Sequence, residues 1–235
     1  WSQSEVRPFR RFKVAIRDEI VTIGNPELVP NGKHRHLSPE DWEKALHEND
    51  VAVIDTRNWY ETKVGKFKNA IELPIEEFTE FGQAVEKLGL PKDKKVLMYC
   101  TGGIRCEKAI LEMERQGFEN VYQLDGGILN YLEKLPNKSW EGECFVFDHR
   151  VAVDQELRPS RRYALCAHCG QPSTNHFACV RCDAPAHNRD KCLQLGSHMK
   201  TCSKNCAYHF SQKPVKGRRQ ELESGTRRSL KSKRV

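Results

Sequence analysis

One segment, residues 95–116, constrains the fold of this 235-residue chain more than any other. An apolar run at 96–99 leads directly to Cys100, glycines follow at 102 and 103, and the next residues predict a helix over 106–116. In parallel α/β sheets, ligand sites lie at the carboxyl ends of the strands. We therefore expect Cys100 at the carboxyl end of a central strand.

The residues on either side of this segment alternate between strand and helix signals. Ser38 can cap a helix, Pro39 fits its first turn, and the acidic pair that follows favours its positive end, which predicts a helix over 39–48. Further strands are expected at 51–55, 70–73, 95–99 and 121–123, and further helices at 78–88, 106–116 and 127–135. This alternation predicts an α/β fold with a mostly parallel sheet and helices on both faces.

Upstream, residues 12–23 alternate between apolar and polar side chains. Phe12, Val14 and Ile16 fall on one face, which predicts a strand, and residues 19–23 predict a second short one. No partner strands are evident in the rest of the sequence, so we expect them in an upstream domain outside this chain. Residues 24–32 are turn-rich and are expected to form a linker.

The residues around Cys100 favour its thiolate form. Gly102 and Gly103 permit backbone angles closed to other residues, so that successive amides can point at one sulfur. The helix start adds its positive end, and Arg105 is a permanent cation. A nucleophilic or sulfur-carrying cysteine requires the thiolate, so Cys100 and Arg105 are the candidate catalytic residues. The expected cradle around the sulfur consists of Thr101, Gly102, Gly103, Ile104 and Cys106.

Other interpretations of these cysteines stay open. Free cysteine is among the most buried residue types, so Cys100 could be an inert core residue, although the glycine pair, the arginine and the helix disfavour this. Cys106 could have a lowered pKa at the helix start, or it could simply pack. Asp55 and Arg57 are expected to form a structural charge pair rather than to act chemically.

Residues 166–209 are rich in cysteine and histidine and poor in apolar side chains, so a hydrophobic core cannot hold them together. Cysteines in C-x-x-C pairs can offer two thiolates to one ion, which predicts structural zinc. Empty thiols and disulfides are the alternatives. One expected site consists of Cys166, Cys169, Cys179 and Cys182, and a second consists of Cys192, Cys202 and Cys206 with either His187 or His209.

The net charge of +7 is concentrated at the carboxyl end. Nine basic and two acidic residues follow position 212, which accounts for the whole excess. We expect residues 213–235 to form a basic disordered tail, with phosphate contact as the alternative. Basic clusters at 7–13 and 158–162 could add to a nucleic-acid surface. No apolar stretch approaches the roughly 18 residues of a membrane span and no export signal is present, which favours a cytoplasmic protein.

The loop at 100–105 resembles that of rhodanese domains, as do residues 55–57, Glu61 and residues 70–74. Longer strings at 99–109, 122–128 and 142–148, with residues 13–14 and 19–24 upstream, resemble the tRNA wobble-uridine hydroxylase family. Most of the amino-terminal domain of that family is then expected to lie outside this chain. The resemblance implies a remnant of an acylphosphatase-like domain with a linker at 1–33, a rhodanese-like domain at 34–140, and a Cys-rich, zinc-binding region at 141–212.

The family resemblance also implies a reaction, the oxygen-dependent hydroxylation of carbon five of the wobble uridine of tRNA. Cys100 matches the essential loop cysteine of that family, and Arg105 and Cys106 match its companions. Oxygen would then be the co-substrate and tRNA the partner, no organic cofactor is evident, no membrane partner is expected, and the oligomeric state is left open.

Two other functions stay open, a persulfide-forming sulfurtransferase and a non-catalytic, zinc-supported RNA-binding protein. A phosphatase is disfavoured, because four residues separate Cys100 from Arg105, whereas the phosphatase relatives of rhodaneses have five.

Overall fold

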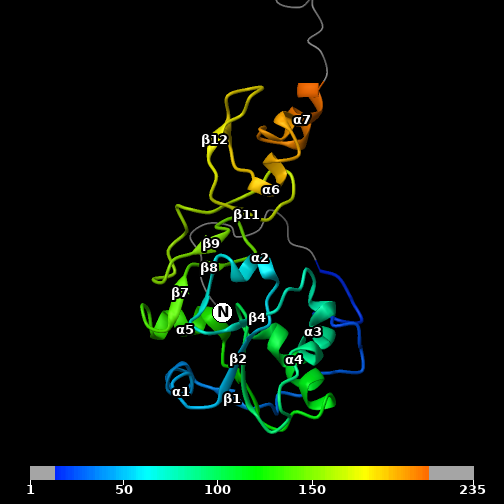
Figure 1. Ribbon diagram of the computed structural model, residues 1–235, viewed down its shortest axis with the longest axis vertical. Helices are drawn as coiled ribbons and strands as arrows, with labels where there is room; N and C mark the ends of the chain where they lie inside the picture. The colour runs from blue at the N-terminus through cyan, green and yellow to red at the C-terminus, as the bar shows by residue number, and fades with distance from the viewer. Residues whose placement is uncertain (1–13, 212–235) are drawn as a thin grey trace, which may run out of the picture. The chain divides into compact units, whose positions relative to one another are not determined.

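Residues 14–211 are the part of the chain that the computed structural model describes (Figure 1). They form two units. One contains the residues up to Cys166 together with Gly170–Thr174, and the other contains Ala167–Cys169 together with the residues from Asn175 on. The basic cluster at 7–13, Phe12 and the tail at 213–235 lie outside the described residues. Within residues 14–211, no helix has the length and apolar character needed to cross a membrane.

A five-stranded sheet forms the centre of the first unit, and every pair of neighbouring strands in it is parallel. The two central strands are buried apolar runs, as expected for a sheet covered on both faces. The predicted α/β fold with a parallel sheet is therefore confirmed. In spatial order the strands are β1 (His36–Leu37), β6 (Val121–Leu124), β5 (Lys95–Tyr99), β2 (Val51–Asp55) and β4 (Ile71–Glu72).

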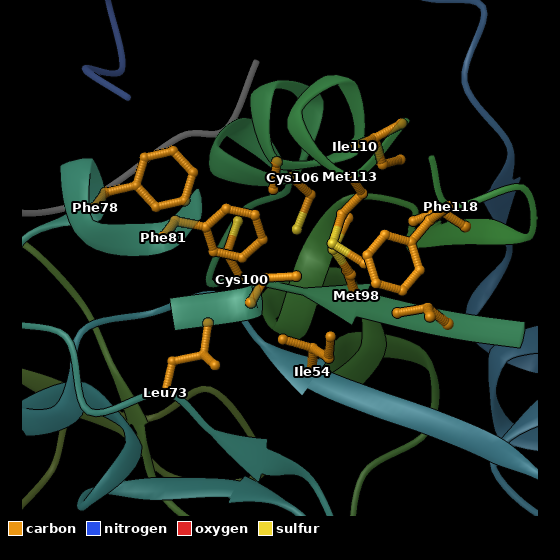
Figure 2. Close-up of a cluster of buried hydrophobic side chains, with 14 of the residues drawn as sticks. Ile54, Leu73, Phe78, Phe81, Met98, Cys100, Cys106, Ile110, Met113 and Phe118 are labelled. Atoms are coloured by element: carbon orange, nitrogen blue, oxygen red, sulfur yellow. The ribbon is translucent and has the colours of Figure 1, made fainter. Parts of the chain in front are cut away.

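Helices cover both faces of this sheet. The side chains of β5 alternate between the faces, as the period of two in a strand requires. Val96 and Met98 join one core cluster, whereas Leu97 and Tyr99 join another. Figure 2 shows part of the first cluster, in which Cys100 and Cys106 lie among apolar side chains. The first cluster contains residues of α3 (Phe81–Lys87) and α4 (Ile104–Arg115), and the second contains residues of α1 (Pro39–Ala45) and α5 (Gly127–Lys134).

Short elements complete the first unit. Phe67 and Trp140 are both buried and lie 5.1 Å apart between ring centroids, and this packing joins two short strands that the sequence pattern did not predict. The elements are α2 (Trp59–Thr62), the 3-10 turn η1 (Phe78–Glu80), and three antiparallel pairs, β3 (Gly65–Phe67) with β7 (Trp140–Gly142), β8 (Cys144–Phe145) with β9 (Ala152–Val153), and β10 (Ala164–Leu165) with β11 (Pro172–Ser173).

The second unit has a small and partly polar interior. Asn188 and Thr201 are fully buried, and the Asn188 side-chain amide donates a 3.0 Å hydrogen bond to the Thr201 carbonyl. Hydrogen-bonded polar side chains and thiols therefore lie where apolar side chains lie in an ordinary core. Its elements are the antiparallel pair β12 (Phe177–Ala178) and β13 (Pro185–Ala186), α6 (Asp190–Leu193), the 3-10 turn η2 (Ser197–Met199) and α7 (Lys204–Ser211).

The strands predicted upstream of the sheet are wrong within the described residues, because residues 14–34 form no strand. Val21, Ile23 and Leu28 pack against the first core cluster instead. The Glu19 carboxylate accepts a 3.1 Å hydrogen bond from the Gly24 N–H and pairs with Lys108. Apolar alternation alone does not make a strand when no neighbouring strand accepts its backbone hydrogen bonds.

Candidate functional site

Cys100 follows β5 directly and lies at the carboxyl end of this central strand, as predicted. The residue is 2% exposed. The Gly103 N–H donates a 3.1 Å hydrogen bond to the Cys100 Sγ. Gly103 precedes the first residue of α4 and has a φ of +87°, a value that glycine adopts without strain. The backbone N–H groups of Arg105 and Cys106 also donate to this sulfur, so inward-pointing amides and the positive end of a twelve-residue helix meet there.

The first turn of α5 (Gly127–Lys134) donates backbone hydrogen bonds to the same loop. The Ile128 N–H donates to the Cys100 carbonyl at 3.0 Å, and the Leu129 N–H donates to the Thr101 carbonyl at 3.1 Å. Both donors belong to the first turn of α5, whose amides have no partner inside the helix. Gly127 has a φ of +66°, and a Cβ at this position would lie 2.5 Å from the Cys100 carbonyl oxygen. Gly127 is thus a functional position that sequence reasoning missed, although the glycine pair at 126–127 was a visible signal.

The Cys106 thiol is a hydrogen-bond partner of the Cys100 sulfur, and this hydrogen bond has the largest effect on the pKa of Cys100. A hydrogen bond from Cys106 lowers the pKa of Cys100, burial opposes this, and the charge of Arg105 adds to the lowering, with a net value of about 6. Burial raises the pKa of Cys106 itself, and the neighbouring Cys100 raises it further. Thr56 Oγ1 lies 3.7 Å from the Cys106 Sγ. The two cysteines therefore form a thiolate and thiol pair, with the negative charge on Cys100.

Arg105 is held by Glu61, a residue to which sequence reasoning gave no role. The two guanidinium nitrogens donate to the two carboxylate oxygens of Glu61 at 2.6 and 2.8 Å. The Glu61 side chain is fully buried, and the Arg105 side chain is 13% exposed. The Asn58 N–H donates a further 3.2 Å hydrogen bond to Glu61. This two-point contact fixes the direction of the cation that helps to ionise Cys100.

Asp55 and Arg57 form a second, separate ion pair that is fully buried. The Arg57 guanidinium donates to the two Asp55 oxygens at 2.9 and 2.6 Å and to the Gly65 carbonyl at 2.7 Å. Its carbon Cζ lies 5.3 Å from the centre of the Trp140 ring. Burial disfavours the charged form of Arg57, but Asp55 outweighs it and the pKa of Arg57 is raised. The pair joins the end of β2 to β3.

The remaining cradle residues differ in how they face the sulfur. Thr101 is nearly buried, and its hydroxyl lies 3.5 Å from an Arg105 nitrogen. Gly102 has open space where a Cβ would stand. The Ile104 side chain is exposed and lines a hollow of about 260 Å³ with residues between 18 and 30. This side chain therefore takes no part in the cradle.

The cysteines of the second unit gather differently from the predicted sets. The sulfur atoms of Cys179, Cys182, Cys202 and Cys206 all lie within 4.8 Å of one another, an arrangement that could hold a metal ion. Cys182 lies 3.6 Å from Cys202 and 3.8 Å from Cys206. All ten cysteines of the chain are free thiols in the structure.

The prediction that Cys179 and Cys182 share a site with the preceding C-x-x-C pair is therefore wrong. The turn after β12 places these two cysteines against the start of α7, which carries Cys206. Within the second unit, Cys169 instead lies within 4.8 Å of Cys192. Cys166 is buried and belongs to the first unit.

The predicted histidine ligands do not belong to the four-sulfur group. His209 lies one turn after Cys206 on α7, and its ring contacts Tyr208 at 5.2 Å between centroids. The His187 ring contacts the His176 ring at 4.4 Å. Four sulfurs already complete the tetrahedral set that a structural metal requires, which leaves no place for a histidine.

Two family models match this chain. A family model described as rhodanese-like domain matches residues 38–134, and one described as rhodanase C-terminal matches residues 141–207. The Alr3790 protein from Anabaena sp., a solved structure, is 21% identical, with a TM-score of 0.39, over 45% of this chain and 91% of that chain.

Two curated relatives are named tRNA uridine(34) hydroxylase. The protein from Bdellovibrio bacteriovorus is 56% identical over 93% of this chain and 63% of the relative, and the protein from Wolbachia pipientis subsp. Culex pipiens is 50% identical over 72% of this chain and 61% of the relative. The chain thus spans about three fifths of the length of these relatives. The predicted resemblance is confirmed: the chain is a homologue of the tRNA uridine(34) hydroxylases, with a rhodanese-like domain and a rhodanase C-terminal region.

Proposed function

We propose that this chain carries the working part of an enzyme that hydroxylates the wobble uridine of tRNA at carbon five, with dioxygen as co-substrate and Cys100 as the working group. The observation that carries the proposal is the 56% identity to a protein named tRNA uridine(34) hydroxylase, because a match over 93% of the chain includes both the Cys100 loop and the cysteine-rich unit. The geometry of the loop adds chemical support, since it favours a thiolate at neutral pH.

The residues around Cys100 limit how a substrate can approach it. Cys100 is 2% exposed, so a base that remained stacked in RNA could not reach its sulfur. Enzymes that act on a base take it out of the stack, and the anticodon loop offers bases that are already unpaired. In this proposal, Gly103 and Cys106 hold the negative charge on the sulfur, and Glu61 keeps Arg105 beside it.

A second function is favoured by one specific observation, the rhodanese-like domain around an ionised cysteine. A sulfane-sulfur donor such as thiosulfate would transfer one sulfur atom to the Cys100 thiolate and release sulfite. The resulting persulfide would pass that sulfur to a thiol acceptor and regenerate the thiolate. This sulfurtransferase reaction needs the same sulfur and the same amide donor as the first proposal.

The cysteines of the second unit fit a structural zinc ion in this proposal. Cys179, Cys182, Cys202 and Cys206 offer four sulfurs in a closed set, which is the donor pattern of structural rather than catalytic zinc. The ion would supply folding energy to a unit whose interior is small. The tRNA is the macromolecular partner in this proposal, and the cytoplasm is the expected location because tRNA is modified there.

The decisive experiment measures hydroxyuridine by mass spectrometry in tRNA from a host strain that lacks its own uridine(34) hydroxylase. The strain is supplied with the wild-type chain, with Cys100→Ser, or with Cys144→Ala as a matched control. Cys144 is a buried cysteine of the same unit, and burial raises its pKa to about 12, so it should not be needed as a thiolate. We expect hydroxyuridine with the wild type and the control, and none with Cys100→Ser.

Other results would point elsewhere. No hydroxyuridine with the wild-type chain would refute the hydroxylase proposal for this chain. Transfer of sulfur to cyanide by the wild type but not by Cys100→Ser would then favour the sulfurtransferase. Unchanged tRNA binding by Cys100→Ser, with no activity in either assay for the wild type, would favour a non-catalytic RNA-binding protein.

A further inference from the structure

The turn between β8 and β9 presents an exposed aromatic ring. Phe147 is 61% exposed. Its neighbours in the sequence are fixed, since Val146 is buried and Asp148 forms an ion pair with Arg150. The turn is closed by backbone hydrogen bonds from the Val146 N–H to the Val151 carbonyl and from the Val151 N–H to the Asp148 carbonyl. Arg150 donates to Asp148 from its backbone and from its guanidinium. The ring is therefore carried by a well-braced turn rather than by a loose loop.

This ring lies beside the cation of the Cys100 loop. The Arg105 carbon Cζ is 5.7 Å from the centre of the Phe147 ring, within the range of a cation–π contact. Arg105 is also one of the groups that lower the pKa of Cys100. Phe147 thus contacts a side chain whose charge acts on the candidate catalytic sulfur.

A row of aromatic contacts fixes the position of Phe147 from the other side. The Phe147 ring meets the Phe145 ring edge-on at 5.0 Å, and Phe145 meets Tyr60 edge-on at 5.7 Å. Tyr60 immediately precedes Glu61, which holds Arg105. The Phe147 ring thus packs on Phe145 of β8, and the Arg105 guanidinium is held by Glu61 of α2. Most of the Phe147 surface stays open to a flat partner.

We propose that Phe147 is a stacking platform for the base of the uridine that is presented to Cys100. The inference rests on the proposed function, since it takes an RNA base as the substrate. Many proteins that bind single-stranded nucleic acid stack the unpaired bases on exposed aromatic rings and on arginine side chains. A small inorganic sulfur donor has no flat face and would gain little from such a ring, so Phe147 fits a nucleobase better than it fits thiosulfate.

The test compares two anticodon stem-loop RNAs that differ only at position 34, one with uridine and one with an abasic sugar. Their dissociation constants are measured with the full chain by fluorescence anisotropy. We expect the wild type to bind the uridine RNA about tenfold more tightly or more, and Phe147→Ala to lose that preference while keeping its affinity for the abasic RNA. Phe147→Tyr, which keeps the ring, should retain the preference.

Two further variants separate stacking from a merely structural role. Phe147→Leu keeps apolar cover over Arg105 without an aromatic face, so it should lose the preference. Tyr208→Ala removes a ring of similar exposure, 62%, from the other unit and should leave the preference unchanged. The inference is overturned if Phe147→Ala or Phe147→Leu keeps the uridine preference, or if the wild type shows no preference for the base.

The hydroxyuridine assay on the same proteins distinguishes this inference from the proposed function. Hydroxyuridine formed equally well by the wild type and Phe147→Ala, at equal kcat/KM, would overturn the stacking role while the function stands. A base preference that depends on Phe147, without any hydroxyuridine, would support the stacking role while the proposed reaction fails.

Discussion

Replacing Glu61 by glutamine should destabilise the α/β unit, because it removes the negative charge that faces Arg105 and keeps the shape of the side chain. The carboxylate is fully buried and accepts hydrogen bonds from two Arg105 nitrogens at 2.6 and 2.8 Å. The amide of glutamine offers one oxygen to the guanidinium and turns an N–H donor toward it at the other position. The arginine would then be a largely buried cation that has lost its carboxylate partner and keeps only the Cys100 thiolate as a negative neighbour.

The size of the effect follows from the burial of the two partners. Breaking a buried ion pair by removing one partner costs about 3–5 kcal/mol of folding free energy. The Arg105 side chain keeps 13% exposure and one acceptor remains, so the lower end, about 3 kcal/mol, is expected. For a unit of this size, this loss lowers the Tm by roughly 6–12 °C.

Urea unfolding followed by circular dichroism measures this loss, and Glu156→Gln is its matched control. Glu156 also pairs with an arginine, Arg158, at 2.7 Å, but its side chain is 45% exposed. Exposed pairs contribute at most about 1 kcal/mol, so the control should unfold nearly as the wild type does. Equal losses in the two variants would refute the reasoning that burial of the Glu61 carboxylate sets the cost.

Three further outcomes are expected. Alkylation of Cys100 by iodoacetamide should accelerate with pH through a midpoint near 6, because only the thiolate reacts and its pKa is lowered to about 6; a midpoint near 9 would contradict the cradle. Gly127→Ala should lower the free energy of unfolding more than Gly117→Ala does, since both have a positive φ that costs about 1–2 kcal/mol for alanine, but only at Gly127 would a Cβ meet the backbone at 2.5 Å. Treatment with a chelator should release zinc and expose the second unit to proteolysis while the first unit keeps its circular dichroism; proteolysis at the same rate with and without chelator would argue against a structural ion.

The central strands and the reactive loop could be predicted from local sequence. The strands at 51–55 and 95–99 have the expected bounds because each is a buried apolar run between turns. Ser38 caps its helix as expected, since its hydroxyl accepts a 3.1 Å hydrogen bond from the Asp41 N–H. Cys100 lies where a loop between a parallel strand and a helix must lie.

The features that the sequence did not predict depend on tertiary contacts. Strands β3 and β7 are short, and they are paired because Phe67 and Trp140 pack together across a long stretch of chain. Glu61 contacts Arg105 although 44 positions separate them in the sequence. Spacing within one segment carries no information about such partners. The grouping of the cysteines is not predictable for the same reason, because C-x-x-C pairs that are adjacent in the sequence need not share an ion.

The crossed pairing in the cysteine-rich unit has a consequence for how this region is made. The stretch that joins Cys169 to Cys192 overlaps the stretch that joins Cys179 to Cys202 and Cys206. During synthesis Cys169, Cys179 and Cys182 leave the ribosome well before Cys202 exists. A metal ion that arrives early therefore meets only two sulfurs of the four-sulfur group, those of Cys179 and Cys182, beside Cys169, which belongs to another group. The complete set becomes available only after the last helix of the unit has emerged.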